Sequence, residues 1–188
     1  GVHMDDHLGT AGGLWLGLCF CDRCVAGFRE YLAGLPAEER RALGLESPAT
    51  YDFRAAVRRW LAEDPARNRS PTQHPLWGSH WTIYQCRAQA AFMQELRELA
   101  AQTAGRPVPF AANAGLLWPR HLSDYPTLDL FSAETDHEAA AQRFSDRPLL
   151  AYRLAEAVGR PYAGTAGGGD WAFVKEHGRH GLVRGWIA

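Results

Sequence analysis

Three cysteines lie within six positions near the start of the chain. Cys19, Cys21 and Cys24 form the pattern C-x-C-x-x-C, and the one other cysteine is Cys86. Thiolates this close together can bind one Zn²⁺, whose structural sites have four ligands in a tetrahedron. The fourth ligand must then come from elsewhere, and Cys86 reads more simply as a small buried side chain of a helix. The alternatives are three reduced thiols in a packed loop, or one disulfide with a spare thiol; the density of the cluster favours a structural metal.

A second group of residues able to do chemistry follows the apolar segments of the sequence. Four carboxylates lie where predicted strands end: Asp5, Asp6, Glu134 and Asp136. Hydrolysis of a glycosidic bond needs a proton donor and a second carboxylate on opposite sides of the bond. Other polar residues near the strand ends could bind sugar hydroxyls: His7, Asn113, Tyr125 and His137. The competing explanation is that strand-terminal Asp residues cap loops and helices, which for any one residue is about as common.

Several other classes of function lack their sequence signatures. The histidines form no H-E-x-x-H pair, so a catalytic metal is not indicated, and no G-x-S-x-G marks a serine hydrolase. Residues 9–13 are glycine-rich but lack G-x-G-x-x-G and a P-loop lysine, so no organic cofactor is expected. A net charge of −1 indicates neither nucleic acid nor an anionic membrane as a partner.

The composition is that of a globular protein. Of the 188 residues, 46% are hydrophobic and 22% charged, and no apolar run reaches the roughly 18 residues of a membrane span. No basic region followed by an apolar stretch marks a signal peptide at the start of the chain. With its cysteines reduced, the protein is expected in the cytoplasm.

The elements that must position these residues alternate between short apolar runs and longer amphipathic stretches. Strands are predicted over 1–7, 108–115, 128–135 and 161–167. Helices are predicted over 21–35, 51–63, 79–105 and 148–159, and a last one from Trp171 onward. Two of the strands follow a Gly-Arg-Pro sequence, and Gly105 and Gly159 lie where helix C-terminal caps belong.

Each strand–helix–strand return implies parallel strands. Four parallel strands fit half of an eight-stranded (β/α)8 barrel, and they also fit a small open doubly wound sheet. We favour the half-barrel, spanning residues 1–188 as one partial domain, because the chain opens on a strand and stops inside a helical pattern. The strands also end in polar or small residues, and in a barrel these ends meet at one mouth.

The segment from Met4 to Leu32 resembles the family 42 β-galactosidases and related glycoside-hydrolase barrels. The resemblance consists of Met4-Asp5-Asp6 at a strand end, the cysteine loop 19–24, and Phe28-Arg29-Glu30-Tyr31-Leu32 in the next helix. It continues more weakly to Asn113 and Glu134, and implies that the chain covers strands four to seven of the barrel. It also implies that the cysteines bind zinc together with a cysteine outside this chain.

The chain departs from that family at both catalytic positions. The family has a Glu as acid/base after an Asn, where this chain has Asp6 after Asp5, and a Glu nucleophile on strand seven, where this chain has no carboxylate before Asp170. We therefore expect Asp6 as proton donor and Glu134 as second carboxylate. Sugar hydroxyls would be bound by Asp5, His7, Asn113 and Asp136. The alternatives are an inactive sugar-binding or scaffold barrel, and an open α/β domain that binds a nucleotide or phosphate. The partners expected are a carbohydrate and the remaining barrel segments.

Overall fold

The computed structural model describes residues 1–4, 19–45, 47–65, 70–113, 119–134 and 146–165, with the backbone alone described at 119–120, 133–134, 146–149, 152 and 164–165. The chain divides into two compact units. The sheet unit comprises Gly1–His7 and Phe92–Ala188, and the helical unit comprises Leu8–Ala91. Helix α5 (Gly78–Ala104) contributes its first half to the helical unit and its second half to the sheet unit. Among the described residues, no helix is long and apolar enough to cross a membrane.

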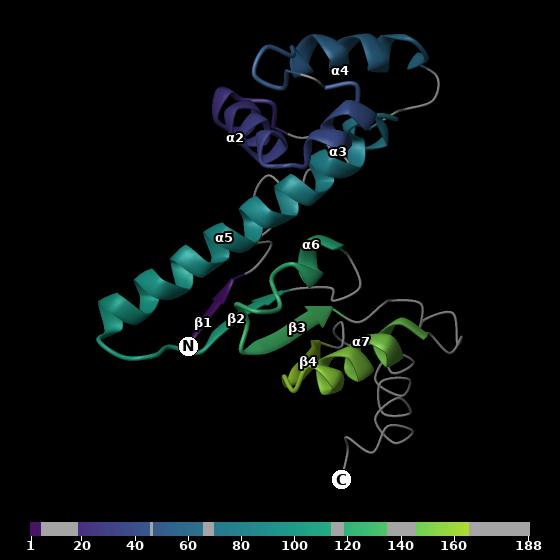
Figure 1. Ribbon diagram of the computed structural model, residues 1–188. Helices are drawn as coiled ribbons and strands as arrows, with labels where there is room; N and C mark the ends of the chain where they lie inside the picture. Colours follow the sequence, from purple (N-terminus) through teal and green to yellow (C-terminus); the bar gives the residue numbers. More distant parts are fainter. Residues whose placement is uncertain (5–18, 46, 66–69, 114–118, 135–145, 166–188) are drawn as a thin grey trace. The chain divides into compact units, whose positions relative to one another are not determined.

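A four-stranded parallel sheet organises the sheet unit (Figure 1). Its strands are β1 (Val2–Met4), β2 (Phe110–Asn113), β3 (Leu130–Glu134) and β4 (Tyr162–Thr165), in the spatial order β1-β2-β3-β4. Every neighbouring pair is parallel. Each strand is therefore added on the same side of the one before it. A doubly wound sheet reverses its strand order at a switch point, and the four described strands contain no such reversal.

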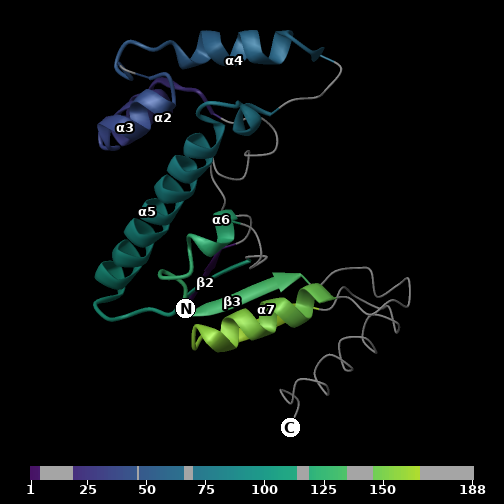
Figure 2. The ribbon, with the colours of Figure 1, turned by 45° about the vertical axis from the view of Figure 1, so that its right-hand side comes forward.

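The two faces of this sheet differ in chemistry. Successive residues of a strand point to opposite faces, and the face that carries Met4, Phe110 and Phe131 packs against helices. Its buried cluster includes Met93 of α5 and Ala151 and Ala155 of α7 (Asp146–Ala157). Figure 2 shows α7 alongside β3. The other face, here called the His3 face, has smaller and more polar residues at the positions that pair across the strands: His3, Ala111, Asn113, Leu130, Ser132 and Ala163.

Helices α5 and α7 end in the same way. Gly105 and Gly159 have φ angles of 65° and 66°, a left-handed conformation that favours glycine. After each glycine an arginine N–H donates back into the helix, Arg106 to the carbonyl of Ala101 at 3.2 Å and Arg160 to that of Ala155 at 2.9 Å. These are Schellman motifs, and they explain why each Gly-Arg-Pro sequence ends a helix and redirects the chain into a strand.

The helical unit has an aromatic core. Its elements are α2 (Asp22–Ala33), α3 (Ala37–Ala42), α4 (Phe53–Ala62), a 3-10 helix (Pro71–Gln73) and the first half of α5. The fully buried Phe28 ring is at its centre, with its centroid 4.7 Å from that of Trp81 and 4.9 Å from that of Phe53. Both contacts are edge-to-face, the geometry that aromatic quadrupoles favour.

The predicted order of strands and helices agrees with the described structure. Each strand begins one or two residues later than predicted, and the predicted C-terminal ends lie outside the described residues. The prediction of a parallel α/β sheet is confirmed. A partial barrel remains a proposal, and the helix expected from Trp171 lies outside the described residues. Three described short helices were not predicted: α3, α6 (Pro119–Leu122) and the 3-10 helix Pro71–Gln73.

Candidate functional site

The three clustered cysteines are the group in the described structure best suited to hold a metal ion. Cys19 and Cys21 precede α2 and Cys24 lies in its first turn, with all three sulfur atoms within 4.8 Å of one another. Four thiolates at about 2.3 Å from a tetrahedral Zn²⁺ lie about 3.8 Å apart. The cluster is therefore close to the spacing that such an ion needs. None of the three forms a disulfide.

Two side chains hold the cysteine loop against the helical unit. Phe20, between Cys19 and Cys21, stacks on Trp81 of α5 with centroids 4.3 Å apart and rings within 1° of parallel. Arg54 of α4 donates from Nε to the Phe20 carbonyl at 2.7 Å and pairs with Asp22 at 2.5 Å. The loop is thus fixed at its backbone and at its one large apolar side chain.

Cys21 and Cys24 differ in acidity. Hydrogen bonds from the Cys24 backbone N–H and from the neighbouring thiols lower the pKa of Cys21 to about 7. Burial, reinforced by the other two cysteines, raises the pKa of Cys24 to about 12. A thiolate is the form that binds metal, and binding releases the thiol protons that remain. The thiolate form is therefore favoured at Cys21 and the protonated thiol at Cys24.

A fourth ligand is absent from the described part of the chain. The described His, Cys, Asp and Glu side chains include none that joins the three cysteines. Cys86, the in-chain candidate, is buried in α5 and lies outside the group. A complete tetrahedral site would need a ligand from residues that are not described, from another segment or from water.

The predicted strand-end residues are described only in part. Asn113 is the last residue of β2, half-buried, and pairs with Ser132 of β3. Glu134 is the last residue of β3, and its backbone pairs with Thr165 of β4. The remaining predicted residues of this site lie outside the described residues: Asp5, Asp6, His7, Asp136 and His137.

Tyr125 belongs to the core. Its ring centroid is 4.6 Å from that of Phe131, and it packs against the cluster on the helix-covered face of the sheet. Burial raises the pKa of its phenol to about 12. The expectation that Tyr125 would lie at the sugar-binding rim is therefore not supported. Its ring packs against the helix-covered face of the sheet instead.

A polar pair on the His3 face was not predicted. His3 Nε2 and Ser132 Oγ are 2.8 Å apart, and Ser132 Oγ donates to the Ala112 carbonyl at 2.9 Å. Strand alternation indicates only that His3 lies on the face opposite Val2 and Met4, and it does not indicate Ser132 as the partner of His3.

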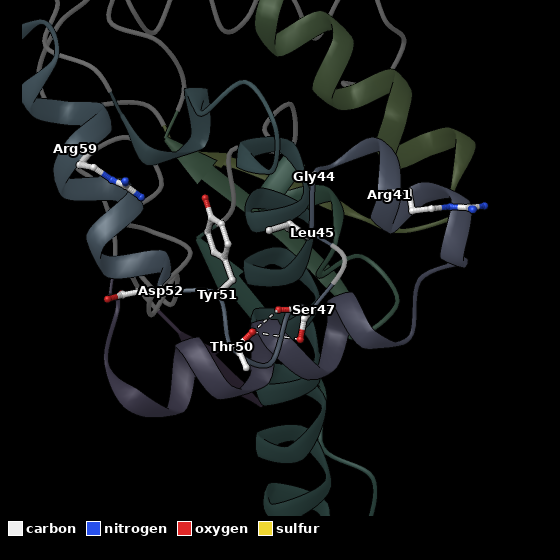
Figure 3. A pocket seen from close by; sticks show the side chains of 8 residues that line it. All are labelled: Arg41, Gly44, Leu45, Ser47, Thr50, Tyr51, Asp52 and Arg59. Atoms are coloured by element: carbon white, nitrogen blue, oxygen red, sulfur yellow. Dashed lines mark hydrogen bonds between the residues drawn. The ribbon is translucent and has the colours of Figure 1, made fainter.

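The helical unit contains a cavity of about 500 Å³ (Figure 3). It is lined by Arg41, Gly44, Leu45, Ser47, Thr50, Tyr51, Asp52 and Arg59. Thr50 donates to Ser47 Oγ at 3.2 Å, and the Asp52 carboxylate accepts from Ala55 N–H at the start of α4. In Figure 3 the side chain of Arg41 extends away from that of Arg59, so the two guanidinium groups do not converge on one anion.

Comparisons with protein-family models, with curated proteins and with solved structures find no match. The functional proposal below therefore rests on the residues and geometry of this chain.

Proposed function

We propose that this chain forms part of a (β/α)8 barrel that binds a carbohydrate at the C-terminal ends of its strands and hydrolyses a glycosidic bond there. The strand order carries the proposal, since a barrel is built by adding each parallel strand on the same side of the last one until the sheet closes. The helix-covered face would be the outside of the strands, and the His3 face the inside.

The residues at the strand ends supply the chemistry of the proposed site. Parallel strands end at one edge of the sheet, which in barrels is where catalytic residues gather. Asn113 ends β2 beside Ser132, and Glu134 follows Ser132 by two positions, the spacing at which strand residues share a face. We assign Asp6 as the proton donor and Glu134 as the second carboxylate. Sugar hydroxyls would be bound by Asp5, His7, Asn113 and Asp136.

Carboxamide variants of the two carboxylates test the assignment. In the full-length protein, Asp6→Asn and Glu134→Gln should each lower turnover of an aryl glycoside by about 10²–10⁴-fold, the range expected for a lost acid or base. The matched control is Glu38→Gln, an exposed carboxylate of α3, which should leave turnover unchanged. Wild-type turnover in both carboxamide variants would refute the assignment.

A catalytically inactive sugar-binding barrel is the second candidate. It is favoured by β4, whose segment Tyr162–Thr165 contains no carboxylate, whereas the resembling family has its nucleophile on that strand. This candidate predicts calorimetric binding of oligosaccharides together with an absence of turnover across a broad panel of glycosides.

The cysteine cluster is proposed to bind a structural Zn²⁺ that fixes the loop before α2. Three close sulfur ligands favour zinc over hard cations such as Mg²⁺. Metal analysis of the full-length protein, purified without chelator, should find about one equivalent of zinc per chain. A protein that contains no metal but folds normally would refute this part of the proposal without affecting the carbohydrate site.

A further inference from the structure

His3 and Ser132 are joined across the His3 face although their strands are not neighbours. His3 lies on β1 and Ser132 on β3, with β2 between them. The residue of β2 that pairs with His3 is Ala111, whose methyl group leaves room for the imidazole to cross above it. The crossing ends in the 2.8 Å contact between His3 Nε2 and Ser132 Oγ.

The hydrogen-bond geometry decides which imidazole nitrogen carries the proton. A serine hydroxyl has one hydrogen, and Ser132 donates it to the Ala112 carbonyl at 2.9 Å. The Ser132 oxygen must then accept from His3, so Nε2 carries the proton. In the neutral imidazole the other nitrogen, Nδ1, is left as a hydrogen-bond acceptor.

The surroundings of this acceptor suit a neutral polar ligand. In the described part of the chain His3 is exposed, while Val2 and Met4 on the opposite face are half-buried. Asn113, paired with Ser132, adds a neutral carboxamide to the same face. The other side chains that the structure describes on this face are uncharged: Ala111, Leu130, Ser132 and Ala163. Glu134, two positions after Ser132, would add a carboxylate, which repels anionic groups. Such a set matches hydroxyl groups better than phosphates or carboxylates, which recruit cations.

We infer that His3 is a substrate-binding residue whose Nδ1 accepts a hydrogen bond from a sugar hydroxyl, and that Ser132 positions it by fixing the Nε2–H tautomer. The inference rests on the proposed carbohydrate-binding function and adds to it a residue that the sequence pattern did not single out. It also gives the polar pair a role beyond stabilising the sheet. A purely structural pair would keep the tautomer but would not respond to sugar.

Long-range ¹H–¹⁵N spectra of the histidine rings in the full-length protein test both parts. The free protein should show a pyridine-type Nδ1 and a protonated Nε2 for His3. Titration with D-galactose and with D-glucose should shift the Nδ1 resonance of His3, because a new hydrogen bond to a lone pair changes its shielding. Ser132→Ala should give a mixture of tautomers.

Two variants of His3 separate the nitrogens. His3→Asn keeps an acceptor near the position of Nδ1 but cannot reach Ser132, and His3→Gln keeps a donor near Nε2 but loses the Nδ1 acceptor. His3→Gln should raise the calorimetric Kd for the bound sugar roughly five- to tenfold, the worth of one neutral hydrogen bond. His3→Asn keeps the acceptor but loses the contact that positions it, so its Kd should rise by less than that of His3→Gln.

The outcomes distinguish this inference from the proposed function. A His3 proton on Nδ1, or sugar binding that leaves the His3 resonances and the Kd of His3→Gln unchanged, overturns the inference and leaves the carbohydrate proposal standing. Absence of binding by either sugar, together with no turnover of any glycoside, overturns both. The spectra use the wild-type protein, so poor folding of a variant does not affect them.

Discussion

Asp129 accepts a hydrogen bond from Arg97 at 2.9 Å, and this ion pair ties the second half of α5 to the entry of β3. The other carboxylate oxygen of Asp129 accepts from the backbone N–H of Phe110 at 3.0 Å, at the start of β2. Arg97 also donates to the Thr127 carbonyl, and Arg160 lies 3.5 Å from the same carboxylate. These contacts are near the N-terminal ends of the strands, at the edge of the sheet opposite the proposed carbohydrate site.

Asp129→Asn is expected to lower the free energy of unfolding by about 1–2 kcal/mol, because an amide loses the charge and offers one acceptor where the carboxylate offers two. The side chains of Arg97 and Asp129 are 31% and 28% exposed, so the expected loss of stability is smaller than for a fully buried ion pair. Urea unfolding provides the measurement. Glu156→Gln, which breaks an exposed pair with Arg153, is the control and should cost less than about 0.5 kcal/mol. Equal losses of unfolding free energy in Asp129→Asn and Glu156→Gln would contradict the proposal that Asp129 stabilises the sheet more than an exposed ion pair does.

Replacing a cysteine of the cluster is expected to remove the metal. Cys21→Ser should reduce bound zinc from about one equivalent to near zero and lower the Tm, because binding free energy contributes to folding free energy. Cys86→Ala is the matched control. It removes the buried thiol outside the cluster and should lower stability while zinc stays bound. Loss of zinc in Cys86→Ala would instead make Cys86 a ligand. Plasma mass spectrometry of dialysed protein gives both stoichiometries.

His74 should make the helical unit sensitive to acid. Its ring stacks on Trp77 with centroids 4.3 Å apart, and burial lowers its pKa below the ordinary 6.5 despite the nearby Glu63. The folded state thus favours the neutral ring. Its contribution to stability is present above the unfolded pKa near 6.5 and is lost as the pH falls through the lower folded value. Wild-type protein should therefore lose more stability than His74→Gln between about pH 7 and pH 5, as measured by urea unfolding at each pH. Parallel pH profiles would refute this.

Gly27 is predicted to be required for the packing of Tyr84 against α2. A Cβ built at Gly27 meets the Tyr84 hydroxyl and lies 3.1 Å from Cζ of the ring. Gly27→Ala should therefore destabilise by about 1–3 kcal/mol through overpacking, although alanine favours a helix by about 1 kcal/mol. Thermal unfolding is the readout.

Two further variants check that the cause is this contact. Gly34→Ala, at the α2 C-cap with φ −76° and the nearest atom 3.4 Å from the added Cβ, should leave stability unchanged or raise it by up to about 1 kcal/mol. Adding Tyr84→Phe to Gly27→Ala should recover part of the loss by removing the closest atom. Independent, additive effects would show that the two residues are not coupled.

The helices and strands were predictable where the local sequence pattern matched the residues that are buried in the structure. Each Gly-Arg-Pro sequence indicated the end of a helix, and the apolar run after it indicated β2 or β4. A left-handed glycine can end a helix independently of tertiary contacts. Helix α3 was missed because its sequence, Ala37–Ala42, is mostly charged and has no buried residue. The apolar side chains that fix its position, Leu43 and Leu45, follow it.

The candidate site was predictable to the extent that it is local. The spacing of Cys19, Cys21 and Cys24 brings the sulfur atoms together within one turn, so the cluster followed from the sequence. His3 and Ser132 meet through the pairing of three strands, and no local pattern contains that information. The expectation for Tyr125 was not supported for the same reason, since its contact with Phe131 depends on the tertiary packing of the turn that precedes β3.

The position of the helical unit in the chain has a kinetic consequence. All of Leu8–Ala91 lies between β1 and β2, so Val2 must find Phe110 across that whole segment, whereas Ala111 finds Leu130 after one short excursion. Loop-closure entropy grows with length, and distant pairings form slowly. We expect β2, β3 and β4 to assemble first, and β1, which carries His3, to add last.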